Sequence, residues 1–124
     1  MNCGLPVGEH MDIYVDDNTL RKAIQDEGLC KRRYGADMAK KLKLRLTALR
    51  AAESLADFWP PKSGPERCHE LKGERAGTFS VDLKQPYRLL FKTSGSASQE
   101  GSDEQQRWKC VTAISILAIE DTHG

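Results

Sequence analysis

Apolar and polar residues first alternate along the chain and then change to a helical spacing. Residues 11–15 alternate and are rich in β-branched and aromatic side chains, which predicts a short first strand. Residues 16–19 offer several helix N-caps, with acidic side chains near the positive end of the helix dipole. Two apolar residues follow at helical spacing, and Gly28 is expected to end this first helix. The segment 31–35 is predicted to be a basic connection or a second short helical turn.

Residues 36–58 form the longest predicted element, a continuous helix. Its apolar residues recur at steps of three and four and make one wide stripe, which is typical of a helix that packs on the core. The main row of the stripe is Met38, Leu42, Leu46, Leu49, Ala52 and Ala56. Prolines at 60 and 61 stop the helix. The rest of the helix surface is predicted to be basic and to carry Lys40, Lys41, Lys43, Arg45 and Arg50.

Beyond the prolines, the apolar spacing changes to the period of two that is typical of strands. The strand candidates are residues 68–71, 78–83, 87–92 and 108–119. The last of them is the most apolar and is expected near the centre of the sheet. Glycines and a proline mark turns between these strands, whereas residues 93–106 are polar, low in complexity and expected to be a mobile loop.

The element order β-α-α-β-β-β-β predicts an α+β fold. Two N-terminal helices are expected to pack on a mostly antiparallel sheet of four to five strands. We expect one domain over residues 11–124, and residues 1–10 stay unassigned. A length of 124 residues agrees with a single core.

The charge of the chain is balanced overall but unevenly distributed. The 19 basic and 18 acidic residues give a net charge of +1, which excludes a protein that binds nucleic acid by bulk charge alone. Residues 20–50 nevertheless carry +7, and a block of this kind can attract a polyanion locally. On composition alone, a solvated helix face is the better interpretation.

The N-terminal sequence and the cysteines bear on where the protein works. The chain has no run of 18 apolar residues, and its first ten residues have neither a basic start nor an apolar stretch. The four cysteines are scattered and show no metal-binding spacing, which favours reduced thiols. We therefore expect a cytoplasmic protein without a membrane partner.

Candidate chemistry comes from polar residues at unusual positions on the predicted strands. Arg88 alternates with Leu89 in an apolar strand, so its side chain is expected on the face away from the core. If the strands pair in sequence order, one face gathers His69, Lys72, Arg75, Arg88 and His123. This set suits RNA cleavage without a metal, because histidine exchanges protons near neutral pH and arginine can hold two phosphate oxygens.

Each of these residues also has a structural interpretation. A strand histidine is commonly a hydrogen-bonded structural residue, and His123 can belong to a free tail. Arg88 can form a salt bridge with Glu70 or Asp82. Taken singly, the structural interpretations are the more common ones, and the pattern alone predicts a small α+β domain with a basic face.

Three segments together resemble the HigB branch of the RelE/ParE toxin superfamily. They are HELKGERAGTFSV at 69–81, YRLLF at 87–91 and IEDTH at 119–123. The segment 51–58 is similar to the end of that family's second helix, and the likeness covers about residues 11–124 in element order. The resemblance implies the RelE-like toxin fold and a bacterial type II toxin that cleaves mRNA on the ribosome without metal or cofactor.

The resemblance also implies partners and residue roles. The implied partners are a HigA-like helix-turn-helix antitoxin, the ribosome and mRNA. Many HigB toxins have a tyrosine where Thr122 stands, and a threonine cannot stack on a base. The implied catalytic residues are His69, Lys72, Arg88, Asp121 and His123. The expected substrate-binding residues are Arg75, Thr122, Lys40, Lys41 and Lys43.

Two other functions stay open at this point. The ParE branch has the same fold and poisons DNA gyrase without RNase chemistry, so the fold alone cannot decide. The combination of His69, Lys72, Arg88 and His123 favours the nuclease. A catalytically weak homologue that mainly binds its antitoxin is the third possibility, and Thr122 keeps it open.

Overall fold

The computed structural model describes residues 11–75, 77–93 and 103–121. In chain order the elements are β1 (Asp12–Val15), α1 (Asn18–Gln25), α2 (Glu27–Tyr34), α3 (Ala36–Ala51), the 3₁₀ turn η2 (Leu55–Phe58), β2 (His69–Glu70), the 3₁₀ turn η3 (Gly73–Arg75), β3 (Thr78–Asp82), β4 (Tyr87–Thr93), α4 (Glu104–Lys109) and β5 (Ala113–Asp121). The described strands form one sheet in the order β1-β5-β4-β3-β2, in which only the β1–β5 pair is parallel. The predicted α+β class is confirmed.

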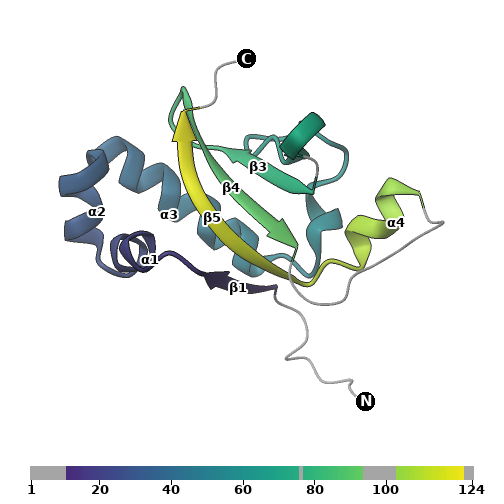
Figure 1. Cartoon of the computed structure of the whole chain (residues 1–124), viewed down its shortest axis with the longest axis horizontal. Coiled ribbons are helices and arrows are strands. Elements are labelled where there is room, and N and C mark those ends of the chain that lie inside the picture. The colour runs from purple at the N-terminus through teal and green to yellow at the C-terminus, as the bar shows by residue number, and fades with distance from the viewer. Residues whose placement is uncertain (1–10, 76, 94–102, 122–124) are drawn as a thin grey trace.

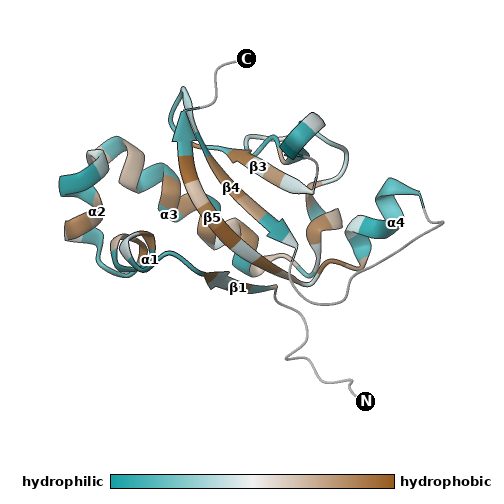
Figure 2. Ribbon diagram, viewed as in Figure 1, coloured by the Kyte–Doolittle hydropathy of each residue, from teal (hydrophilic) through white to brown (hydrophobic). Residues whose placement is uncertain are grey.

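The core lies between the helices and one face of the sheet. Helices α1 and α2 gather at one end of the long axis, and α4 lies at the other end (Figure 1). Hydrophobic residues concentrate along the middle of β4 and β5, whereas α4 is mostly hydrophilic (Figure 2). Leu42 and Leu49 of α3 belong to the same buried cluster as Phe91 and Ile116 of the sheet. No helix in the described part of the chain is long and apolar enough to span a membrane.

The N-terminal region contains three helices, not the expected two. Asp17 caps α1 by accepting a hydrogen bond from the Thr19 amide at 2.8 Å. Asp26 then ends α1 and caps α2, and its side chain accepts from the Leu29 amide at 3.1 Å. Gly28 therefore lies inside α2 and does not end the first helix, because an aspartate that competes for backbone donors creates the boundary two residues earlier.

The predicted continuous helix over 36–58 is wrong in its last part. Helix α3 ends at Ala51, and η2 follows as a separate turn. The Ser54 hydroxyl accepts from the Ala56 amide at 3.2 Å, and the Leu55 amide donates to the Val111 carbonyl at 3.0 Å. These partners take backbone donors that a continuing helix would have used. The prediction that Leu49 is buried is confirmed, since none of its surface is exposed.

The C-terminal strand begins later than the sequence suggested. Trp108 lies in α4, which Asp103 caps by accepting from the Gln106 amide at 2.8 Å, and β5 starts only at Ala113. Most of the predicted loop 93–106 lies outside the described residues. Strand β5 is an interior strand between β1 and β4, and β4 occupies the middle of the sheet.

Strand register defines an outer face, the side of the sheet turned away from the core. Phe79 and Val81 pair with Phe91 and Leu89 on the core side. Because successive side chains alternate, the residues between them point the other way. The outer face is therefore formed by Ser80 and Asp82 of β3, Arg88 and Leu90 of β4, and Ala118 and Glu120 of β5.

Candidate active site

Arg88 lies on the outer face, as its alternation with Leu89 predicted. Its side chain is only 22 % exposed, and its Nε lies 3.6 Å from Asp82 Oδ1. Asp82 stands directly opposite Arg88 in the β3–β4 pair. Of the two salt bridges considered from the sequence, the structure forms the one to Asp82, while Glu70 accepts from the Gly77 amide at 2.8 Å.

Asp82 is the most buried carboxylate of the outer face. Its residue is 6 % exposed, and its Oδ2 lies 3.4 Å from Arg67 Nε. The Asp82 amide donates to the Glu66 carbonyl at 2.8 Å, and its own carbonyl accepts from Arg45 Nε at 2.6 Å. Two guanidinium groups thus compensate a charge that would be costly to bury alone.

Arg45 is not the surface residue that the helix pattern predicted. It is 7 % exposed, and besides the Asp82 carbonyl it donates to the Pro65 carbonyl through Nη2 at 3.2 Å. Position 45 lies three residues after Leu42, so it belongs to the buried stripe of α3. Its guanidinium is accommodated there because it supplies donors to backbone carbonyls, and it ties α3 to the end of β3.

His69 also belongs to the outer face, because it pairs with Ser80. Its Nδ1 lies 2.8 Å from the Arg67 carbonyl oxygen. A carbonyl only accepts, so Nδ1 carries the hydrogen in this contact, and in the neutral form of the ring the lone pair is then on Nε2. The preceding Cys68 is fully buried, and this burial, with Glu66 as a smaller cause, raises the pKa of its thiol to about 12. The thiol is therefore protonated and unreactive at neutral pH.

A third guanidinium reaches the outer face from the turn between β2 and β3. Arg75 Nη2 donates to Oε1 and Oε2 of Glu120 at 2.8 and 2.9 Å. Glu120 lies on β5 opposite Arg88, so Arg75 bridges the β2–β3 turn and β5. The outer face thus gathers one imidazole, three guanidinium groups and two carboxylates.

Two further predicted residues lie near this face but not in the cluster. Lys72 is exposed directly after β2 and makes no hydrogen bond or ion pair with any described residue. Asp121 pairs with Tyr87 and so points to the opposite side of the sheet from Arg88. Thr122 and His123 lie outside the described residues.

The predicted substrate-binding lysines of the long helix lie on the side of the sheet opposite the outer face. Lys40, Lys41 and Lys43 are exposed on α3, which packs against the other side of the sheet. They can contribute to binding a polyanion there, but they do not reach Arg88 through the sheet. The structure therefore divides the predicted residues into an outer-face group and a helical group.

The sequence did not single out Arg67 as a site residue, and it presented Asp82 only as a structural partner. The position of Asp82 beside Arg88 could have been inferred from the sequence, because a turn at residues 84–86 sets residue 82 opposite residue 88 in the β3–β4 hairpin. Nothing comparable in the sequence places Arg67 beside Asp82. It comes to Asp82 through a left-handed backbone conformation with φ of 49°, which sequence patterns do not mark in an arginine.

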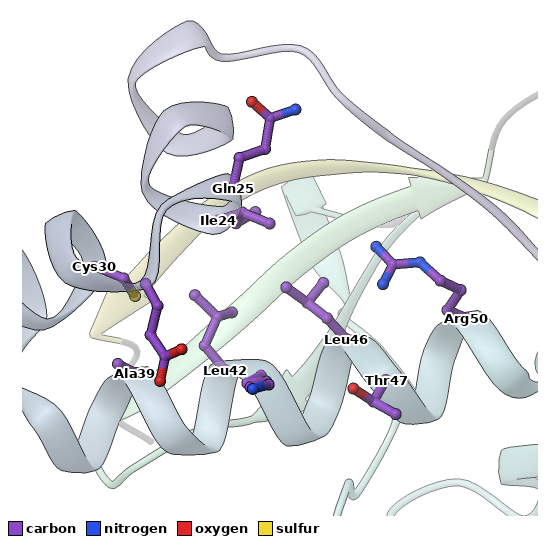
Figure 3. Close-up of a pocket in the computed structure, with 10 residues that line it drawn as sticks. Ile24, Gln25, Cys30, Ala39, Leu42, Leu46, Thr47 and Arg50 are labelled. Atoms are coloured by element: carbon purple, nitrogen blue, oxygen red, sulfur yellow. The ribbon is translucent and has the colours of Figure 1, made fainter.

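One pocket lies on the helical side, and neither His69 nor Arg88 lines it. It has a volume of about 290 Å³ and is lined by both apolar and polar side chains of α1, α2 and α3. Leu42 and Leu46 point from α3 toward Ile24, with Gln25 and Arg50 at the rim (Figure 3). In the described part of the chain, no three His, Cys, Asp or Glu residues are grouped so that they could hold a metal ion.

Comparisons with known proteins define the fold. No family model and no curated protein matches the sequence. A solved YoeB/ParE toxin from Agrobacterium tumefaciens is similar over 91 % of this chain and 100 % of its own, with 16 % identity and a TM-score of 0.53. The YoeB dimer from Staphylococcus aureus is similar over 93 % of this chain and 99 % of its own, with 14 % identity and a TM-score of 0.51. The chain therefore has the RelE-like α+β fold of the YoeB and ParE toxins.

Proposed function

We propose that this chain is the toxin of a type II toxin–antitoxin pair and cleaves mRNA on the ribosome. The fold is shared with proteins described as toxins, although a shared fold alone does not define an activity. The observation that carries the proposal is the composition of the outer face. An imidazole with a free Nε2 lies on the same face as Arg67, Arg75 and Arg88.

The proposed reaction is an attack of the ribose 2′-oxygen on the neighbouring phosphorus. Nε2 of His69 takes the proton from the 2′-hydroxyl, and the bond between phosphorus and O5′ breaks. The products are a 2′,3′-cyclic phosphate and a 5′-hydroxyl end. The leaving O5′ takes up a proton, for which His123 is the proposed donor, with Lys72 as a further proposed catalytic residue. Asp121 points to the opposite side of the sheet and is left out of the proposed reaction.

Arg88 is the proposed clamp on the scissile phosphate. Its Nε faces Asp82, whereas its two Nη nitrogens make no hydrogen bond with any described residue. That edge of the guanidinium can hold two phosphate oxygens. Because negative charge builds up on these oxygens in the transition state, the contact gains strength as the reaction proceeds.

The ribosome and an antitoxin are the proposed partners. Lys40, Lys41 and Lys43 would contact ribosomal RNA through its phosphates, and we propose a HigA-like helix-turn-helix antitoxin. Arg75 and Thr122 would contact the message. Replacement of the three lysines by alanine is expected to weaken ribosome binding and to flatten its dependence on salt, while leaving the outer face intact.

The test is cleavage of a defined message on purified ribosomes. Arg88→Ala should lower cleavage by about 10²-fold or more, the size of effect seen when one preorganised donor is removed. His69→Gln should lower it by about 10²- to 10⁴-fold, the contribution typical of a general base. Lys92→Ala is a matched control, because Lys92 is exposed on the same face at the far end of β4. Parental cleavage by Arg88→Ala would contradict the proposal. In cells that express the chain, DNA breaks without RNA fragments would support a gyrase poison instead.

A further inference from the structure

We infer that Asp82 is a positioning residue that holds both Arg88 and His69 in place. Its carboxylate acts on Arg88 directly and on His69 through Arg67. The catalytic consequence rests on the function proposed above, in which Arg88 and His69 carry out the chemistry. The structural link itself can be tested without any RNA.

The direct link is the contact between Asp82 and Arg88. Oδ1 of Asp82 lies 3.6 Å from Arg88 Nε, which is within reach of an ion pair but beyond a hydrogen bond. Buried Oδ1 has no hydrogen-bond partner in the described part of the chain. The carboxylate therefore orients the guanidinium by charge and leaves both Nη groups free to turn toward a phosphate.

The indirect link runs through both ends of Arg67. Its guanidinium Nε lies 3.4 Å from Asp82 Oδ2, and its backbone carbonyl accepts from His69 Nδ1 at 2.8 Å. A left-handed conformation is uncommon for a residue other than glycine, so the backbone of Arg67 needs an anchor. The Arg67 amide donates to the Ser63 carbonyl at 3.1 Å, and the ion pair with Asp82 anchors the residue at its side chain. By fixing that carbonyl, Asp82 fixes which nitrogen of His69 carries the hydrogen.

Asp82 is itself held rigidly enough for this role. Its amide and carbonyl are bound by Glu66 and Arg45 at 2.8 and 2.6 Å, on either side of the carboxylate. Its side chain is 8 % exposed, so solvent screens the ion pair with Arg88 weakly, whereas the pair with half-exposed Arg67 is screened more. Asparagine at this position keeps the shape and removes the charge, and it leaves Arg67 and Arg88 without their shared counter-ion.

The first experiment reads the hydrogen position of His69 by ¹⁵N NMR of the imidazoles. The chain has three histidines, and His69→Gln identifies the resonances that belong to His69. The parent should show His69 with hydrogen on Nδ1, whereas Asp82→Asn and Arg67→Gln should show a mixture of both tautomers. Arg67 is half exposed, so Arg67→Gln tests the same link if Asp82→Asn does not fold.

A matched control removes a similar ion pair elsewhere. Asp37 lies 3.4 Å from Lys84 Nζ on the exposed surface, and Asp37→Asn should leave the His69 resonances unchanged. If His69 keeps its hydrogen on Nδ1 in both Asp82→Asn and Arg67→Gln, the indirect link is overturned.

The second experiment measures cleavage of a ribosome-bound message. Asp82→Asn should lower kcat by about 10- to 100-fold with KM near that of the parent, a smaller loss than the 10⁴-fold seen when an aspartate touching a catalytic histidine is neutralised. A shifted tautomer with parental kcat would overturn the catalytic consequence. If the parent cleaves no RNA, the proposed function fails, whereas the NMR result still decides the structural link.

Discussion

Replacing Arg45 by methionine should destabilise the fold through two backbone carbonyls. Methionine has similar length and suits a buried helix stripe, but it has no N–H donor. The Asp82 carbonyl, now bonded at 2.6 Å, would then be buried without this partner, which costs about 1–3 kcal/mol. The partly buried Pro65 carbonyl, bonded at 3.2 Å, adds about 1 kcal/mol.

The net loss should be about 2–3 kcal/mol, because methionine also removes the cost of burying a guanidinium. For 124 residues, about 1 kcal/mol lowers Tm by about 4 °C, so Arg45→Met should melt about 8–12 °C below the parent. Lys43→Met is the control, since Lys43 is exposed two residues earlier on α3, and it should change the free energy of unfolding by less than about 0.5 kcal/mol. If Arg45→Met melts within about 2 °C of the parent, the hydrogen bonds of Arg45 contribute nothing to the stability of the fold.

Three further predictions concern the core, the thiols and the outer face. Leu49→Ala should lower the free energy of unfolding in urea by about 2–5 kcal/mol, because Leu49 is fully buried; a loss near zero would contradict its place in the core. At pH 8 a thiol reagent should modify exposed Cys110 long before Cys68, because burial raises the pKa of the Cys68 thiol to about 12. Equal modification rates for the two cysteines in peptide mapping would refute this. Because the folded chain holds the Cys68 proton more tightly, stability should also fall as pH rises above the ordinary thiol pKa of 9.0. Glu120→Gln should release Arg75 and so tighten the binding of an RNA oligonucleotide. Because the Arg75–Glu120 pair is exposed, the free energy of unfolding should change by less than about 1 kcal/mol. Weaker RNA binding would count against an RNA site on this face.

Features that depend on neighbouring residues could be predicted from the sequence. Alternation and turn residues place β3 and β4 within one or two residues of their observed bounds, because a hairpin forms from adjacent chain. The same alternation correctly put Arg88 on the face away from Leu89. The resemblance to the RelE/ParE toxins predicted the fold, which the solved structures support.

Features that depend on distant partners could not be predicted. Arg45 looked like part of a basic helix surface, and only the carbonyls of Asp82 and Pro65 explain its burial. Helix α3 stops at Ala51 partly because Leu55 donates to Val111, more than fifty residues along the chain. Arg67 joins the site only once β3 is in place, so no local pattern marks it.

The chemical ends of the cleaved message test the central claim most directly. Attack by the 2′-oxygen on the outer face predicts fragments that end in a 2′,3′-cyclic phosphate, or in the 3′-phosphate formed when its ring opens, and begin with a 5′-hydroxyl. These fragments should be abundant with the parent and nearly absent with His69→Gln and Arg88→Ala. Fragments with 5′-phosphate and 3′-hydroxyl ends, or equal amounts from the parent and both variants, would contradict the proposed chemistry of this face.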